Sequence, residues 1–209
     1  METSELTRRM LKGVVADAAF HFYVVPELGQ HGWKDIPLAT NEAYDHMLAD
    51  RGGEVTIQVK LQRSELGKPV IKRAGHFIVE VQKTRTGKKK VKGEPNGDGE
   101  VSAEVVDTRP YAYGDFQILA VSLWPSTKDW KRFRYTVAEW LVPRPGSPNL
   151  IAVMQPVAAA PNNVWTDDFT QAVAWLRDHK NVSPVKTAAP QASQATGSRD
   201  VDLFKTLGV

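Results

Sequence analysis

Residues 44–63, YDHMLADRGGEVTIQVKLQR, decide the fold that this sequence predicts. After the Arg51-Gly52-Gly53 break, every second side chain is apolar, and the polar side chains between them are Glu54, Thr56, Gln58, Lys60 and Gln62. Alternation with a period of two is typical of a strand with one buried face. The apolar row therefore predicts contact with a core, and the polar row predicts either a solvated outer face or a cleft.

The regions around this strand predict an α/β (α+β) fold. Residues 44–49 are expected to form a strand that pairs with residues 54–63 through a tight turn. Irregular chain is expected before it, and further strands within GHFIVEVQKT (75–84), DFQILAVSLW (115–124) and YTVAEWLVPR (135–144). Helices are predicted over residues 4–25, ended by Pro26 and Gly29, and over residues 165–179, capped by Thr166. The expected architecture is a central mixed sheet of about five strands flanked by helices.

Composition limits the class of protein. The chain has 209 residues, of which 42% are hydrophobic, so residues 1–180 are expected to form one domain with a real core. Cysteine is absent, which excludes disulfides, a thiol nucleophile and a cysteine-ligated zinc site, and fits a cytoplasmic location. No signal peptide, membrane-spanning run, P-loop or dinucleotide-binding glycine motif is visible, and the spacing of the histidines does not indicate zinc, so His46 is interpreted as structural.

A candidate catalytic group combines two residues of the polar row with an acid that precedes them. Asp45 precedes Gln58 by thirteen residues, and Gln58 and Lys60 form a Q-x-K pair on one face of the strand. An acid and a second oxygen ligand can hold Mg²⁺, which activates water and offsets phosphate charge. Lysine can orient or deprotonate that water, or stabilise the pentavalent state. The pattern indicates metal-assisted phosphodiester hydrolysis.

These residues resemble the PD-(D/E)XK nuclease superfamily, in particular its Mrr-like, restriction-endonuclease-like members with Q-x-K in place of E-x-K. The segment Gly13-Val14-Val15-Ala16-Asp17 resembles the G-x-x-x-E motif of that family's first helix. The resemblance implies a restriction-endonuclease-like core and a Mg²⁺-dependent DNA endonuclease of restriction or anti-phage defence. It further implies Asp45 and Gln58 as metal ligands, with Lys60 and Asp17 as the other catalytic residues.

Glutamine at position 58 departs from the usual acid of this family. A neutral ligand favours one Mg²⁺ over two, and it leaves open a catalytically inactive relative that binds DNA or acts as an adaptor. Glu80, on the strand predicted within residues 75–84, is considered both as an additional acid and as a solvated neighbour.

Basic residues follow the proposed site, although the net charge is only +3. Lysine and arginine supply the phosphate contacts that dominate DNA affinity, whereas the alternative is a loop kept soluble by its charge. The candidate DNA-binding residues are Arg63, Lys72, Arg73, Lys83, Arg85, Lys88, Lys89 and Lys90, with Lys68 and Lys92 beside them. Cleavage of both strands of a duplex would call for two active sites, so a homodimer or a subunit of a larger defence complex is expected.

The C-terminal region changes in composition. Residues 181–198 are rich in Ser, Ala, Thr, Pro and Gln, which predicts a disordered linker. Residues 199–209 then restore apolar side chains, with Leu203 and Phe204 as candidate partner-binding residues. This run resembles the Leu-Phe peptides by which bacterial proteins bind the replication sliding clamp, with Asp200 where glutamine is usual. Packing against the domain or against a second copy is the alternative.

Overall fold

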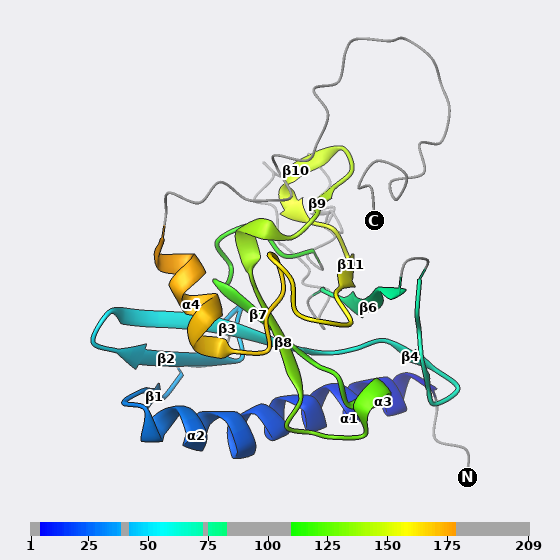
Figure 1. Cartoon of the computed structure of the whole chain (residues 1–209). Coiled ribbons are helices and arrows are strands. Elements are labelled where there is room, and N and C mark those ends of the chain that lie inside the picture. The colour runs from blue at the N-terminus through cyan, green and yellow to red at the C-terminus, as the bar shows by residue number, and fades with distance from the viewer. Residues whose placement is uncertain (1–4, 39–41, 73–74, 83–109, 179–209) are drawn as a thin grey trace, which may run out of the picture.

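The structure, a computed structural model, describes residues 5–38, 42–72, 75–82 and 110–178, with side chains from residue 11 onward (Figure 1). Of the predicted regions, the basic loop from residue 83, Arg73, the linker and the C-terminal peptide with Leu203 and Phe204 lie outside the described residues. None of the described helices combines the length and apolar character needed to span a bilayer.

A five-stranded mixed sheet forms the centre of the domain, which confirms the predicted architecture. Its strand order is β1-β2-β3-β7-β8, with β3 and β7 parallel and the other neighbours antiparallel. The strands are β1 (Lys34–Ile36), β2 (His46–Asp50), β3 (Gly53–Leu61), β7 (Ile118–Ser122) and β8 (Phe133–Val137). The short β1 lies in a stretch expected to be irregular, and β8 begins and ends earlier than the predicted strand 135–144, because the chain enters a 3-10 turn at Ala138–Trp140.

The β2–β3 hairpin has the predicted turn. Asp50 pairs with Gly53, so that Arg51 and Gly52 form a two-residue connection. Gly53 has a φ of 109°, a left-handed conformation that favours glycine, and the Asp50 carboxylate accepts a hydrogen bond of 2.8 Å from the Gly52 N–H. The local sequence therefore fixes both the turn and the register of the hairpin.

Both faces of the sheet are covered, so the expectation of a wet polar row is wrong for Gln58 on β3 and for Gln62, which directly follows β3. Helices α1 and α4 cover the face of Val55, Ile57 and Val59, with Phe20 and Phe169 in the shared core. The opposite face packs against a second apolar cluster from the later part of the chain: Val79, Val81, Tyr111, Phe116, Ile151, Val157 and Trp165. Gln58 and Gln62 lie beneath this second layer and are each only 1% exposed, whereas Glu54 at the hairpin end is exposed.

The N-terminal helical segment passes through Pro26 instead of ending there. It comprises α1 (Glu5–Ala19), a π-helical stretch (Phe20–Val24, η1) and α2 (Val25–Gln30). Pro26 is the second residue of α2, in the first turn, where the missing N–H of proline costs least. The π-helical stretch directly precedes α2. The prediction that Pro26 ends the helix is therefore wrong, and the helical segment continues to Gln30 beneath the sheet (Figure 1).

Three two-stranded sheets flank the central one. The strand predicted within residues 75–84 is β6 (Phe77–Glu80), which pairs with β11 (Met154–Val157) and is not part of the central sheet. The chain directly after β3 lies antiparallel beside β6, because Gln62 forms a single bridge with Val79 and the Arg63 N–H donates to the Ile78 carbonyl at 2.7 Å. The other two sheets are β4 (Ser64–Glu65) with β5 (Lys68–Pro69), and β9 (Pro143–Arg144) with β10 (Ser147–Ile151).

The last described helix, α4 (Phe169–Arg177), begins at a different cap from the one predicted. Asp168 is the N-cap, and its carboxylate accepts hydrogen bonds from the Thr170 and Gln171 N–H groups, while Thr166 accepts from the Asp168 N–H. At the other end, Arg177 donates to Asp50 at 2.8 Å and joins the helix to the β2–β3 hairpin.

Candidate active site

The candidate site lies where β2 separates from β3. The pairing of β2 ends with His46 opposite Ile57, followed by a hydrogen bond of 2.9 Å from the Asp45 N–H to the Ile57 carbonyl. Two residues further along β3, the Val59 N–H donates to Asp45 Oδ2 at 2.8 Å. The side chain of Asp45 therefore takes the place that a paired strand would occupy, next to the backbone of Val59.

Gln58 joins Asp45 to the second apolar cluster. Its Nε2 donates to Asp45 Oδ2 and, over 3.4 Å, to the Val59 carbonyl oxygen. Its Oε1 accepts a hydrogen bond of 2.9 Å from the Tyr111 hydroxyl. The structure thus brings together Asp45 and Gln58, the two residues predicted as metal ligands, and adds the Val59 carbonyl to the same point.

Lys60 lies beside this group and is partly buried. Its Nζ is 5.6 Å from the centre of the Tyr111 ring, a cation–π distance. Burial lowers the pKa of Lys60, against the opposing charges of Asp45, Asp17 and Glu80. Burial likewise raises the pKa of Asp45, and the positive charge of Lys60 opposes this shift. The predicted acid and lysine therefore act on each other electrostatically in a partly desolvated place.

Asp17 is held at the edge of this group by a histidine. Its Oδ1 lies 2.8 Å from His46 Nε2, and the His46 ring is buried, 4.9 Å from the ring of Phe20. The negative charge of Asp17, like that of Asp45, opposes the lowering of the Lys60 pKa. Glu80 acts on Lys60 as well and accepts a hydrogen bond from Gln82. His46, interpreted as structural, supports the Asp17 carboxylate.

The donors at this point suit a hard cation once the Gln58 amide is turned over. Among the residues that the structure describes, no group of three or more His, Cys, Asp or Glu side chains could hold a metal ion. Turning the amide by half a turn exchanges its nitrogen and oxygen, after which oxygens of Asp45, Gln58 and Val59 face one point. Carboxylate, amide and backbone carbonyl oxygens are ligands that Mg²⁺ accepts, so the donor set fits.

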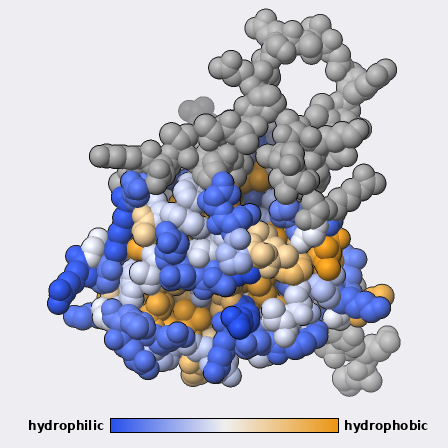
Figure 2. All heavy atoms as spheres, viewed as in Figure 1, coloured by the Kyte–Doolittle hydropathy of each residue, from blue (hydrophilic) through white to orange (hydrophobic). Residues whose placement is uncertain are grey.

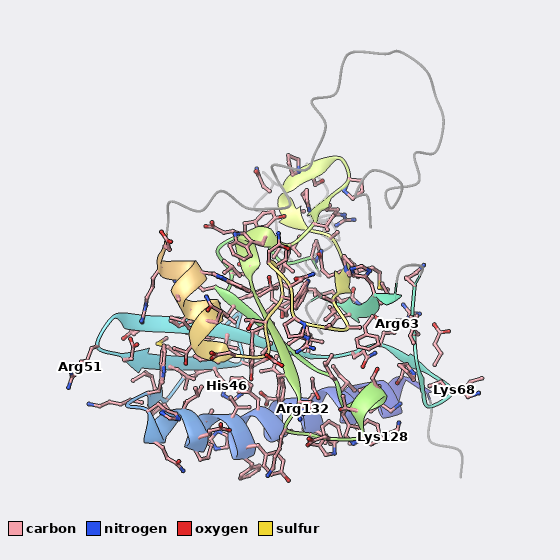
Figure 3. The ribbon with its side chains drawn as sticks, in the orientation of Figure 1. His46, Arg51, Arg63, Lys68, Lys128 and Arg132 are labelled. Carbon is pink, nitrogen blue, oxygen red and sulfur yellow. The ribbon has the colours of Figure 1, made fainter. Side chains whose placement is uncertain are left out.

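Three of the basic residues singled out in the sequence, Arg63, Lys68 and Lys72, lie in the described part of the chain. Arg63 is 30% exposed and donates to Glu65 at 3.0 Å and to the Met154 sulfur at 3.6 Å. Lys68 and Lys72 are exposed. Figure 3 shows Arg63 and Lys68 on the side of the molecule that carries the β4–β5 hairpin. In Figure 2, which has the same orientation, hydrophilic residues lie between patches of hydrophobic ones. Arg63 is thus partly engaged by its own chain, and Lys68 is the more accessible cation.

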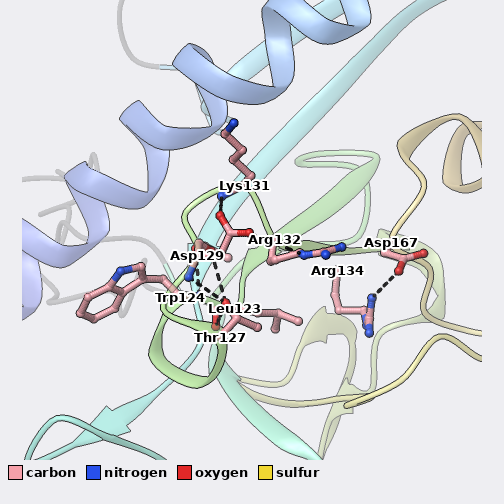
Figure 4. A network of polar contacts seen from close by, with 9 residues as sticks. Leu123, Trp124, Thr127, Asp129, Lys131, Arg132, Arg134 and Asp167 are labelled. Carbon is pink, nitrogen blue, oxygen red and sulfur yellow. Dashed lines mark hydrogen bonds and ion pairs between the residues drawn. The ribbon is translucent and has the colours of Figure 1, made fainter.

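A second basic group, in the segment between β7 and β8, was not predicted from the sequence. It consists of Lys128, Lys131 and Arg132, all exposed, in the stretch STKDWKR (126–132). Lys128 lies 4.7 Å from the ring centre of Trp124, and this ring stacks on Trp130. Hydrogen bonds from Thr127 to the Leu123 carbonyl, at 3.0 Å, and from the Lys131 N–H to Asp129, at 2.9 Å, fix the loop (Figure 4). The alternation of basic and aromatic residues was the signal that could have identified it.

Sequence reasoning also missed Tyr111 and the Val59 carbonyl. Tyr111 lies 53 residues beyond Gln58 in the chain, so its place beside the Q-x-K pair depends on the tertiary fold. The Val59 carbonyl is a backbone group that becomes available because β2 begins only at His46, opposite Ile57.

The comparison with solved structures finds distant similarity. A bacterial homing endonuclease of known structure aligns with 79% of this chain and 89% of its own, at 18% sequence identity and a TM-score of 0.40. No protein-family model matches the chain, and no curated protein matches it. We therefore infer function from the side chains of this chain itself.

Proposed function

We propose that the chain is a Mg²⁺-dependent DNA endonuclease that hydrolyses phosphodiester bonds, in restriction or anti-phage defence. The observation that carries this proposal is the convergence of the Asp45 carboxylate, the Gln58 amide and the Val59 carbonyl where β2 separates from β3. The amine of Lys60 lies beside them.

The residues divide the chemistry between them. Asp45, Gln58 and the Val59 carbonyl would hold Mg²⁺, which when bound offsets phosphate charge and makes a water molecule more acidic. Lys60 orients or deprotonates the attacking water, or stabilises the pentavalent phosphorus. Asp17, fixed by His46, assists from α1 by adding negative charge near Lys60.

The basic residues supply contacts to the DNA backbone. Exposed lysines and arginines bind phosphate without reading sequence, so they set affinity and salt dependence. The proposed contacts from the described part of the chain are Arg63, Lys68, Lys72, Lys128, Lys131 and Arg132. Double-strand cleavage would require two copies of the site, in a homodimer or in a larger defence complex.

A plasmid-nicking assay tests the proposal. Supercoiled DNA should be nicked or linearised with Mg²⁺ and remain intact with EDTA. Asp45→Asn and Lys60→Ala should each abolish cleavage, whereas Gln58→Glu should be tolerated because it restores a carboxylate. Cleavage that survives both Asp45→Asn and Lys60→Ala would show that the activity comes from elsewhere.

A catalytically inactive DNA-binding or adaptor protein is the second candidate. Gln58 favours it, because its amide nitrogen satisfies Asp45 and the Val59 carbonyl without a cation. Such a protein would act through its basic residues and its C-terminal peptide with Leu203 and Phe204. DNA binding without cleavage under Mg²⁺ or Mn²⁺ would favour this candidate over the endonuclease.

A further inference from the structure

Tyr111 contacts two residues of the candidate site at once. Its hydroxyl donates to Gln58 Oε1 at 2.9 Å, and its ring lies 5.6 Å from Lys60 Nζ. The side chain is 5% exposed and packs edge-to-face against Phe116, with 5.2 Å between ring centres. Its position is therefore fixed by the second apolar cluster, independently of the site.

The Gln58 amide has to turn before its oxygen can meet a cation. Its nitrogen now faces Asp45 and the Val59 carbonyl, and an amide nitrogen is a donor without metal-binding capacity. After the turn, the nitrogen faces Tyr111 in place of the oxygen. A phenol hydroxyl both donates and accepts hydrogen bonds, so Tyr111 can pair with either end of the amide.

We propose that Tyr111 is a positioning residue for cation binding: its hydroxyl holds the Gln58 amide and changes from donor to acceptor when the amide turns toward the cation. This inference rests on the proposed function, since it assigns a role at the same site. The ring additionally keeps Lys60 next to the amide.

Titration calorimetry of Mg²⁺ into DNA-free protein tests the role without measuring cleavage. Tyr111→Phe keeps the ring and removes the hydroxyl. In the cation-bound state the buried amide nitrogen then lacks its acceptor, whereas in the free state an amide oxygen lacks a donor. In proteins, a buried N–H group without an acceptor is rarer than a buried carbonyl oxygen without a donor. The substitution should therefore destabilise the cation-bound state more than the cation-free state. We expect an affinity about 10-fold lower, as for other residues that orient a metal ligand.

Tyr113→Phe is the matched control. Tyr113 lies two residues from Tyr111 in sequence, and its hydroxyl donates to the Leu141 carbonyl at 2.7 Å. Removing it deletes a comparable hydrogen bond and should leave the Mg²⁺ affinity unchanged. In ¹⁵N–¹H spectra, the side-chain amide signals of Gln58 should move on addition of Mg²⁺ in the wild type.

A double-mutant cycle with Gln58→Glu separates positioning from packing. A carboxylate presents oxygen in either orientation, so Tyr111→Phe should cost less than about 2-fold in this background. Equal losses in both backgrounds, or no loss in the wild-type background, would overturn the role of Tyr111 while leaving the endonuclease proposal standing. Failure of the wild-type protein to bind either Mg²⁺ or Mn²⁺ would overturn the endonuclease proposal itself, and the role of Tyr111 with it.

Discussion

The carboxylate of Asp45 accepts a hydrogen bond of 2.8 Å from the backbone N–H of Val59, fourteen positions further along the chain. The same oxygen, Oδ2, also accepts from the Gln58 amide. One oxygen of Asp45 thus satisfies both donors, so the contribution of Asp45 to stability can be separated from its negative charge.

Asparagine and alanine at position 45 should therefore behave differently. In Asp45→Asn, the amide oxygen can accept both hydrogen bonds, so the free energy of unfolding should change by less than about 1 kcal/mol, although the proposed cation site is lost. Asp45→Ala leaves the Val59 N–H and the Gln58 amide without their acceptor and should cost about 1–3 kcal/mol. Urea denaturation measures both values. Equal destabilisation by the two variants would show that the charge itself holds this region together.

The local elements of this site follow from the sequence, but the environment of the site does not. The alternation of residues 54–62 and the Arg51-Gly52-Gly53 break predict the hairpin, because register and turn depend on neighbouring residues. The same alternation suggested a wet face for Gln58, which the second apolar cluster covers. That cluster comes from residues far along the chain, and no periodicity within β3 could reveal it. Tyr111 was missed for the same reason.

Two buried glutamines should differ strongly in how much stability is lost when each is replaced by methionine. Gln155, in β11, accepts from the Val142 N–H and donates to the Val142 and Ala152 carbonyls, at 2.7–2.9 Å. Gln62 bonds Ser126 through its oxygen at 2.8 Å, and its Nε2 is the one buried side-chain nitrogen or oxygen without a hydrogen-bond partner among the described residues. Gln155→Met leaves the Val142 N–H and the Val142 and Ala152 carbonyls without these hydrogen-bond partners. Gln62→Met removes an amide nitrogen that already lacks one.

We expect Gln155→Met to lower the free energy of unfolding by about 3 kcal/mol and Gln62→Met by less than about 1 kcal/mol. Chemical denaturation of both variants beside the exposed control Gln171→Ala checks the difference. A loss for Gln62→Met as large as that for Gln155→Met would mean that the Gln62 nitrogen has a partner in solution.

The Asp50–Arg177 ion pair should make stability depend on acidic pH. The hydrogen bond from Arg177 lowers the pKa of Asp50, so the folded state favours the ionised carboxylate. A lowered folded-state pKa gives a contribution that is fully present above the unfolded value of about 3.9 and is lost as pH falls through the folded value. Thermal melts of wild type and Asp50→Asn should differ at pH 6 and converge toward pH 2. A difference that stays constant over this range would rule out the linkage.

Gly52 should tolerate no side chain as long as Arg177 is present. A Cβ at Gly52 would lie 2.5 Å from the Arg177 guanidinium, which would have to move away from Asp50. Gly52→Ala should therefore destabilise the protein through the loss of this ion pair. In an Arg177→Ala background nothing remains to be displaced, and Gly52→Ala should become neutral, because the two substitutions act on the same contact. Thermal denaturation of the wild type, the two single variants and the double variant measures the coupling. Additive losses of stability would show that Gly52→Ala acts on the turn backbone and not through Arg177.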